Sequence, residues 1–329
     1  MRKQIEDFAK SLGFDLVGFS PAKIEEKYLK AFENWIDSGH QGEMGYMEKI
    51  ERRSDLTKIL PGAKSVICLA LNYNYPQEPL KPDGIRVARY AYGRDYHKTI
   101  GKKLKQLVKF LEEVAPEHQH RWYVDTGPLL ERALAEQSGL GRIGKNGCLI
   151  TEQYGSWVFL AEVITTLDLT EKTSSKTSFS TSRWSHSPKN PSGNVCGNCT
   201  KCIDACPTGA IIKPGVVDSR LCISYLTIEH KDKIPPHLKK IIDKTKRLYG
   251  CDICQEVCPH NAAREKTHTH PELNEPKIAT DQLDKKELKK IHTRADYLAR
   301  FAGSALMRSK QLPKLTSIES YSDTNPPIS

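Results

Sequence analysis

The chain has 329 residues, of which 38% are hydrophobic, and it carries a formal net charge of +10. This composition predicts a soluble globular protein of about two domains and excludes a disordered or fibrous chain. No apolar run approaches the roughly 20 residues of a membrane span, and the N-terminal segment has charges of both signs, unlike a signal peptide. We therefore expect a cytoplasmic monomer without membrane contact, and the basic charge suits a polyanionic partner.

Helical and strand patterns alternate over residues 1–170. Apolar residues recur at helical spacing over 2–12 and 22–38, and 96–114 reads as one long amphipathic helix. Residues 65–72 form a β-branched and apolar run that is typical of a buried strand. Two further strands are expected at 121–124 and 157–165, and a helix at 128–137. The fold class we predict is α+β or α/β, with a first layered domain over 1–170.

Three segments follow this domain. Residues 171–194 contain eight Ser, three Thr and two Pro without any hydrophobic period, so we predict a linker there. Residues 195–264 are rich in cysteine and form the second predicted domain. Residues 265–329 are expected to contain short helices at 282–291 and 295–307, followed by a disordered tail.

Most of the cysteines follow the spacing of a bacterial two-cluster ferredoxin. A first run with two, two and three intervening residues ends in Cys-Pro, and a second run repeats its end; the runs are Cys196, Cys199, Cys202, Cys206 and Cys251, Cys254, Cys258. In such ferredoxins the first three cysteines of a run bind one [4Fe–4S] cluster, and the fourth binds the other. The predicted ligands of cluster one are therefore Cys196, Cys199, Cys202 and Cys258.

The second cluster needs a fourth ligand beside the three that the runs supply, which are Cys206, Cys251 and Cys254. Cys222 is the candidate because it lies between the two runs. Cys68 and Cys148 are expected to be small buried hydrophobes instead. A pair of zinc sites is the alternative, but zinc sites rarely show three cysteines at two-residue spacing followed by Cys-Pro.

The first domain offers fewer signals of its own. It has no GxGxxG after a strand and no P-loop. A polar strand-to-helix turn at 124–128 and a glycine-rich segment at 138–147 are its candidate ligand-binding elements. Ordinary turn chemistry explains the glycines equally well, and Asp125 is equally suited to be a helix N-cap.

Several segments together resemble the epoxyqueuosine reductase family, from about residue 1 to 308: ERRSDLTKILPGAKSVI, VDTGPLLERALAEQSGLGRIGKNG, GSWVFLAEVITTLDL, CGNCTKCIDACPTGAI, LCISYLTIEHK and YGCDICQEVCPHN. The resemblance implies a cobalamin-binding α/β domain followed by a two-[4Fe–4S] ferredoxin-like domain and a short helical C-terminus. It also implies reduction of epoxyqueuosine to queuosine at the wobble position of the tRNAs for Asp, Asn, His and Tyr. Electrons would come from an external donor, such as a flavodoxin or ferredoxin, through the clusters to cobalamin.

The resemblance further implies roles for single residues. Asp125 would donate a proton to the epoxide oxygen, which calls for a pKa raised by burial or by a like charge. The expected cobalamin contacts are Arg53, Tyr96, Asp125, Lys145, Asn146, Ser224, Asp252 and Gln255. The stretch 231–247, with seven Lys or Arg and two Asp, would lie near cluster two and dock the anticodon stem-loop, unless it is an ordinary solvated helix face.

Three features depart from the family pattern. The segment 171–194 is long and rich in Ser, and a short tail replaces the usual helical-repeat region after 303–308. Arg142 and Ile253 stand where an aromatic residue and an acid are usual. Two other functions stay open: a corrinoid-dependent reductive dehalogenase and a non-catalytic ferredoxin-type electron carrier. The absence of an export signal and the basic stretch argue against the dehalogenase, and the carrier would need no cobalamin.

Overall fold

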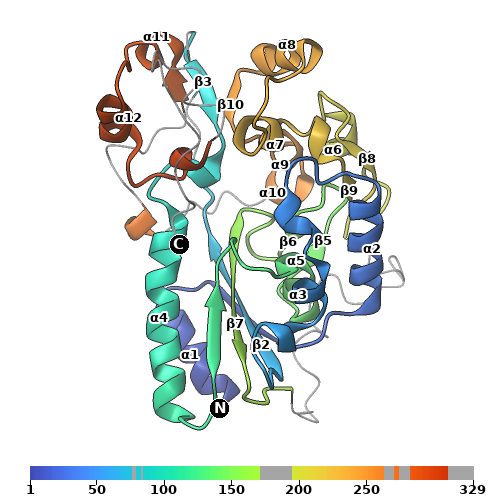
Figure 1. Ribbon diagram of the computed structural model, residues 1–329, viewed down its shortest axis with the longest axis vertical. Coiled ribbons are helices and arrows are strands. Elements are labelled where there is room, and N and C mark those ends of the chain that lie inside the picture. The colour runs from blue at the N-terminus through green and yellow to red at the C-terminus, as the bar shows by residue number, and fades with distance from the viewer. Residues whose placement is uncertain (76–78, 83, 171–194, 263–269, 274–281, 310–329) are drawn as a thin grey trace.

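The computed structural model describes residues 1–75, 79–82, 84–170, 195–262, 270–273 and 282–309 (Figure 1). Its centre is a sheet in the order β1-β2-β7-β4, in which each neighbouring pair is antiparallel. The expected mixed α and β architecture is thereby confirmed. The strands of this sheet are β1 (Leu16–Pro21), β2 (Ser65–Asn72), β4 (His120–Tyr123) and β7 (Val158–Thr165).

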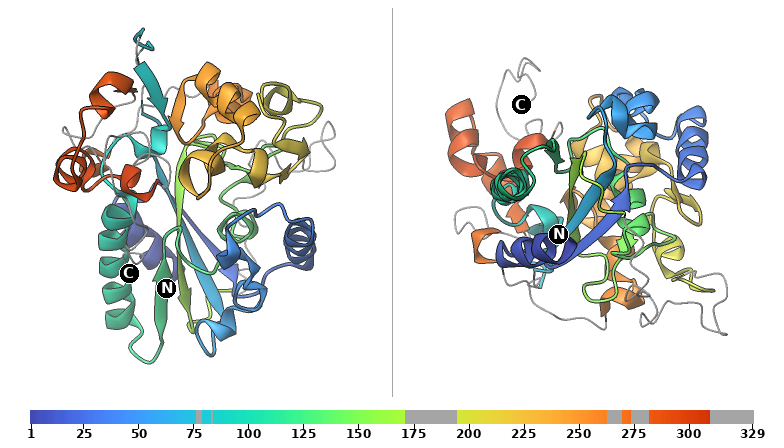
Figure 2. Two further views of the ribbon diagram at one scale, coloured as in Figure 1. Left: turned by 45° about the horizontal axis from the view of Figure 1, so that its top comes forward. Right: turned by 90° about the horizontal axis from the view of Figure 1, so that it is seen from below.

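The central strand β2 explains why helices cover both faces of the sheet. All of its residues are buried, as the sequence predicted, and successive side chains point to opposite faces. Its odd-numbered residues from 67 to 71 pack with α1 and α4, and its even-numbered residues from 66 to 70 pack with α5. Figure 2 shows α1 and α4 on one side of the sheet, and α2 and α3 on the other. These helices are α1 (Arg2–Ser11), α2 (Glu26–Asp37), α3 (Ile50–Ser54), α4 (Tyr96–Val114) and α5 (Glu131–Gln137).

A second sheet joins the first predicted domain to the later parts of the chain. Its middle strand β3 (Gly84–Val87) pairs in parallel with β10 (Arg247–Tyr249) and antiparallel with β11 (Gln282–Asp284). Two helices, α11 (Lys285–Leu288) and α12 (Arg294–Phe301), complete its apolar core. The predicted helix over 282–291 is therefore wrong at its start, because residues 282–284 pair along the edge of β3.

Besides β10, the cysteine-rich segment consists of short helices and two small strands. Its elements are α6 (Lys201–Asp204), β8 (Ile211–Lys213), β9 (Val216–Val217), α7 (Ile223–Ile228), α8 (Pro236–Thr245), α9 (Ile253–Glu256) and α10 (Pro259–Ala262). Asn261 fixes it to the central domain, because its Oδ1 accepts the N–H of Ser156 (2.8 Å) and its Nδ2 donates to the Ser156 hydroxyl (2.9 Å). Only glycine fits at Gly155, where a Cβ would lie 2.0 Å from that Oδ1.

The remaining elements are short. A hairpin of β5 (Arg142–Ile143) and β6 (Leu149–Ile150) lies beside the cysteine-rich segment, and the 3-10 turns are η1 (Gly45–Glu48), η2 (Leu56–Lys58), η3 (Arg89–Ala91), η5 (Ser219–Leu221), η6 (Pro271–Leu273) and η7 (Ala305–Arg308). Among the described helices, none has both the length and the apolar character needed to cross a bilayer. The linker predicted at 171–194 and the tail beyond 309 lie outside the described residues.

Candidate functional site

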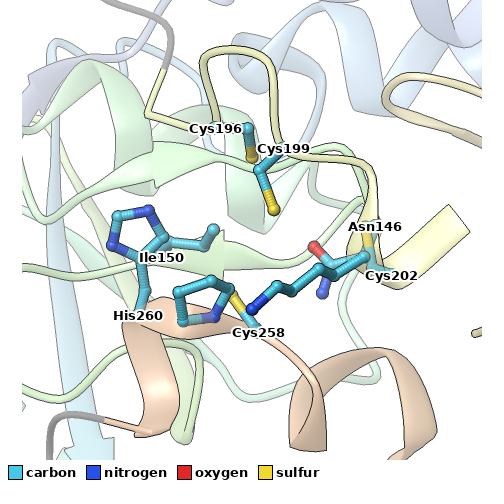
Figure 3. Close-up of a pocket in the computed structure, with 9 residues that line it drawn as sticks. Asn146, Ile150, Cys196, Cys199, Cys202, Cys258 and His260 are labelled. Carbon is cyan, nitrogen blue, oxygen red and sulfur yellow. The ribbon is translucent and has the colours of Figure 1, made fainter.

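The four cysteines predicted for cluster one line a single cavity (Figure 3). Three of them come from the loop before α6 and from α6 itself, and Cys258 comes from the turn between α9 and α10. Burial, followed by the nearby thiols of Cys196 and Cys258, raises the pKa of Cys202 to about 11. These thiols destabilise each other's ionised forms unless a cation binds them, as an iron–sulfur cluster would.

The cysteines predicted for cluster two form a second group. Burial raises the pKa of Cys222, and the neighbouring thiols of Cys206 and Cys148 act in the same direction. Burial also raises the pKa of Cys251 to about 12, with Cys222 among its neighbours. Cys254 is close to Cys251 and Cys222 as well, so these three cysteines lie together.

Cys148 lies closer to this second group than the sequence indicated. Its side chain hydrogen-bonds Cys254. The hairpin β5–β6 carries it there, and the glycines of this hairpin are needed for its own tight packing: a Cβ at Gly141 would lie 2.3 Å from the carbonyl oxygen of Ile150. The close packing of the hairpin thus accounts for the glycine at position 141.

Lys145 and Asn146, two residues expected to contact cobalamin, lie beside the first cysteine group. The backbone N–H of Lys145 donates to Cys196 Sγ (3.3 Å), and its Nζ donates to the carbonyls of Gly197 (2.8 Å) and Cys199 (3.0 Å). Asn146 lines the same cavity, and its buried Nδ2 meets no acceptor in the described part of the chain. Donors beside the cysteine sulfurs and the cavity are suited to stabilise a bound, reduced cluster.

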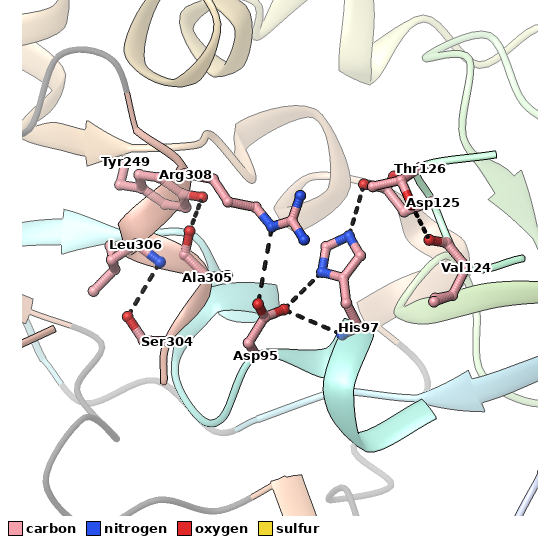
Figure 4. Close-up of polar contacts among 10 residues, drawn as sticks. All are labelled: Asp95, His97, Val124, Asp125, Thr126, Tyr249, Ser304, Ala305, Leu306 and Arg308. Carbon is pink, nitrogen blue, oxygen red and sulfur yellow. Dashed lines mark hydrogen bonds and ion pairs between the residues drawn. The ribbon is translucent and has the colours of Figure 1, made fainter. Parts of the chain in front are cut away.

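Asp125 forms the centre of a strained turn at the end of β4 (Figure 4). Its φ is +58°, and the N–H of Thr126 donates to the carbonyl of Val124 (2.6 Å) around it. Such a left-handed conformation costs a non-glycine residue about 1–3 kcal/mol and is often retained for function. The N-cap interpretation of Asp125 is wrong, because α5 begins at Glu131 and its N-cap is Leu130.

A chain of charged side chains leads from Asp125 into the protein (Figure 4). His97 Nε2 lies 3.1 Å from Asp125 Oδ2, and His97 Nδ1 lies 2.6 Å from Asp95 Oδ1. Arg308 Nε is 3.9 Å from the other oxygen of Asp95. The Asp125 side chain is 56% exposed, whereas that of His97 is 10% exposed. A substrate therefore reaches Asp125 first, with the imidazole behind it.

The electrostatics of Asp125 differ from the sequence-based expectation. Desolvation raises the pKa of Asp125, but the hydrogen bond and charge of His97 outweigh it, helped by the Tyr96 hydroxyl, and the net pKa is lowered. Conversely, burial lowers the pKa of His97, but its bonds to Asp125 and Asp95 prevail and raise it. The expected raised pKa of Asp125 is thus wrong, because the hydrogen bond and charge of His97 outweigh the effect of burial on the carboxylate.

Arg53 and Tyr96, also expected to contact cobalamin, support the Asp125 turn. Arg53 is 5% exposed, and its Nη1 donates to the carbonyls of Gly127 and Leu129, both at 3.3 Å. The Tyr96 ring stacks on Phe159 at 4.1 Å between centroids, and its hydroxyl reaches Asp125. Both side chains therefore hold the turn from beneath.

The last three expected cobalamin contacts lie in the cysteine-rich segment. Asp252 Oδ2 accepts the N–H of Arg89 (2.8 Å), and burial raises the pKa of Asp252 to about 6. Gln255 Oε1 accepts the hydroxyl of Ser156 (2.9 Å), so both residues fix this segment to the central domain. Ser224 is half-buried, and its backbone N–H hydrogen-bonds the sulfur of Cys222.

Comparison with known proteins identifies the family. Residues 53–126 match the family described as "Epoxyqueuosine reductase QueG, DUF1730", and residues 195–261 match the "4Fe-4S double cluster binding domain". An epoxyqueuosine reductase from Gloeobacter violaceus is 40% identical over 312 residues, which cover 93% of this chain and 91% of that protein. The chain belongs to the epoxyqueuosine reductase family. A relative of the same name from Cellulophaga algicola is 42% identical, covering 91% of this chain and 90% of its own.

Solved epoxyqueuosine reductase structures share the fold. One contains an epoxyqueuosine-modified tRNA-Tyr stem loop; it is 31% identical with a TM-score of 0.79, covering 94% of this chain and 78% of its own. Another, from Bacillus subtilis, is 31% identical with a TM-score of 0.78 and the same coverages, and its catalytic aspartate loop is swung out of the active site. Membership of the family argues against the dehalogenase and electron-carrier alternatives. The double-cluster match over residues 195–261 supports [4Fe–4S] clusters rather than the zinc alternative.

Proposed function

We propose that this protein reduces the epoxide of epoxyqueuosine to the alkene of queuosine in tRNA, with Asp125 as the proton donor and cobalamin as the redox cofactor. The observation that carries the proposal is an exposed Asp125 carboxylate, backed by a buried His97, in the same chain as a double [4Fe–4S] domain. The overall change consumes two electrons and two protons, and it releases the epoxide oxygen as water. Each [4Fe–4S] cluster carries one electron at a time, so a pair of clusters suits this stoichiometry.

The residues of the chain supply the protons. Asp125 delivers a proton to the oxygen as the epoxide opens, and His97 replaces that proton through the 3.1 Å contact. Asp95 holds the imidazole by its other nitrogen, so the nitrogen facing Asp125 keeps its orientation. Arg308 neutralises the far oxygen of Asp95. An external donor, such as a flavodoxin or ferredoxin, would reduce the clusters.

Cobalamin would bind beside Asp125. Of the residues expected to contact it, Asp125 is exposed and Ser224 half-buried, whereas the others are buried or engaged with protein partners. Tyr46, 52% exposed and close to Asp125, adds an aromatic surface that suits a large flat ring. When bound, the corrinoid supplies a strongly reducing cobalt centre, and the protein contributes position and protons.

The basic stretch supports tRNA as the substrate. Leu238 and Ile242 bury one face of α8 in a core that includes Cys222 and Cys251, so α8 covers the second cysteine group. Its exposed face carries lysines such as Lys244. Phosphates of an anticodon stem-loop would dock there, and the wobble base would have to leave its stack to reach the reaction centre.

The first test replaces Asp125 with asparagine. The change keeps the shape of the side chain but removes the proton, so we expect turnover to fall about 10²- to 10⁴-fold while clusters and cobalamin stay bound. Reduced enzyme, cobalamin and epoxyqueuosine-containing tRNA are mixed anaerobically, and the nucleosides are analysed by mass spectrometry. Asp37→Asn, on the exposed end of α2, is the matched control. Full activity of Asp125→Asn removes Asp125 from the mechanism, and failure of the wild type to remove one oxygen overturns the proposed function.

A further inference from the structure

Two carboxyl groups meet beneath the Asp125 turn. Glu162 lies in the middle of β7, where it pairs with Cys68 of β2 and Tyr123 of β4, and its side chain is completely buried. Neither of its oxygens meets a donor from another described residue, and the group it faces is the carboxyl of Glu131. Glu131 begins α5, and its Oε1 is enclosed as well.

This pair has to share a proton. Two ionised carboxylates in contact inside a protein repel each other and lack solvation, whereas one proton between them creates a hydrogen bond. Burial raises the pKa of Glu131 to about 8 and raises that of Glu162 well above its ordinary value. Glu131 faces the positive charges of Arg132 and His97, whereas Glu162 faces only acids and the Cys68 thiol. The shared proton therefore resides on Glu162, and Glu131 is the acceptor.

Glu131 also reaches the catalytic turn. Its carboxyl is close enough to the backbone N–H of Asp125, the residue whose φ of +58° is strained, for that N–H to lower the pKa of Glu131. Arg53 holds the following residues through the carbonyls of Gly127 and Leu129. The turn is thus held from beneath at both of its ends. The Bacillus subtilis relative, with its catalytic aspartate loop swung out, demonstrates that a turn of this kind has a second position.

We propose that Glu131, receiving a proton-mediated hydrogen bond from Glu162, is a positioning residue that latches the Asp125 turn inside the active site. This inference rests on the proposed role of Asp125. In the latched state, Glu162 donates to Glu131, and Glu131 accepts the N–H of Asp125. Without an acceptor at position 131, the strain at Asp125 favours the swung-out position, and the carboxylate leaves both the substrate and His97.

The test compares two side chains of nearly equal size at position 131. Glu131→Met fills the same volume but accepts no hydrogen bond, whereas Glu131→Gln keeps the acceptor oxygen for Asp125 and donates its amide to Glu162. Loss of one buried hydrogen bond should lower kcat about 5- to 30-fold in Glu131→Met, with an unchanged KM for tRNA, since the turn acts after binding. Glu131→Gln should stay within about threefold of the wild type.

The same substitutions in the Asp125→Asn background separate the latch from a general loss of stability. If Glu131 acts through Asp125, Glu131→Met causes no further loss there. Iron and sulfide content and the Tm serve as folding controls for each variant. Three results would each overturn the latch. They are a wild-type kcat in Glu131→Met, a loss of kcat in Glu131→Gln as large as that in Glu131→Met, and a loss from Glu131→Met in the Asp125→Asn background as large as its loss in the wild type. Full activity of Asp125→Asn alone instead overturns the role of Asp125, so the two failures are distinguishable.

Discussion

Replacing His97 with glutamine tests whether the proton that reaches the substrate comes from behind Asp125. His97 lies between two carboxylates, at 2.6 Å from Asp95 and 3.1 Å from Asp125. Glutamine retains a donor toward Asp125 but cannot carry a titratable proton. A positioned general acid contributes about 10²- to 10⁴-fold, so we expect kcat to fall at least about 10²-fold, or about 2.7 kcal/mol of activation free energy.

The pKa shifts of His97 and Asp125 determine in which direction activity changes with pH. The pKa of His97 is raised above 6.5 in the folded protein, so the stabilisation from its ion pairs is complete below 6.5 and is lost as the pH rises through the folded-state pKa. The pKa of Asp125 is lowered below 3.8, so its contribution is lost only as the pH falls through that lower value. Between these limits the ion pair is intact. Wild-type activity should therefore decline on the alkaline side, above pH 6.5.

Single-turnover reactions with pre-reduced enzyme, over a range of pH, measure this alkaline limb of the pH profile, the decline in activity above pH 6.5, directly. In His97→Gln the alkaline limb that belongs to His97 should disappear, and the residual rate should be independent of pH in that region. His118→Gln, beyond the far end of α4 from His97, is the control because His118 contacts Thr166 instead. An alkaline limb that is unchanged in His97→Gln refutes the proton supply from His97.

Two further predictions concern the clusters and the tRNA. Cys222→Ser should lower the iron content from about eight to about four atoms per chain, whereas Cys148→Ser should keep about eight. The reverse result would make Cys148, and not Cys222, the fourth ligand of the second cluster. Lys244→Glu on α8 should reduce the slope of log affinity for the stem-loop against log salt by about one, whereas Lys102→Glu on α4 should leave the slope unchanged. Equal slopes for the two charge reversals would remove α8 from the tRNA-binding surface.

Regular spacing made part of this molecule predictable. The two cysteine runs are local patterns, and the buried strand at 65–72 and the helix at 96–114 have unambiguous periodicity. Cys222 was predicted as a ligand because it lies between the two cysteine runs, and in the structure it lies beside Cys206. By contrast, β11 is a strand only because β3 offers an edge to pair with, and short segments carry too little periodicity to reveal such a partner.

The environment of Asp125 depends on contacts between distant residues. His97 and Asp125 are separated by a long helix and a strand, and Arg308 comes from the other end of the described chain. The spacing of these residues in the sequence does not indicate that they lie close together in the fold, so the lowered pKa of Asp125 was not predictable. Glu162 did leave a signal, since a single acid within the buried run 157–165 calls for a partner.

A low pKa does not prevent Asp125 from acting as a proton donor. The oxygen of an opening epoxide develops alkoxide character, and an alkoxide is far more basic than either a carboxylate or an imidazole. Proton transfer to that oxygen is therefore downhill whether the proton starts on Asp125 or on His97. Geometry then decides which group delivers it, and the exposed Asp125 is the one that a substrate reaches. The raised pKa of His97 keeps a proton within hydrogen-bonding distance of Asp125, so the pair acts as one acid whose outer member transfers and whose inner member supplies.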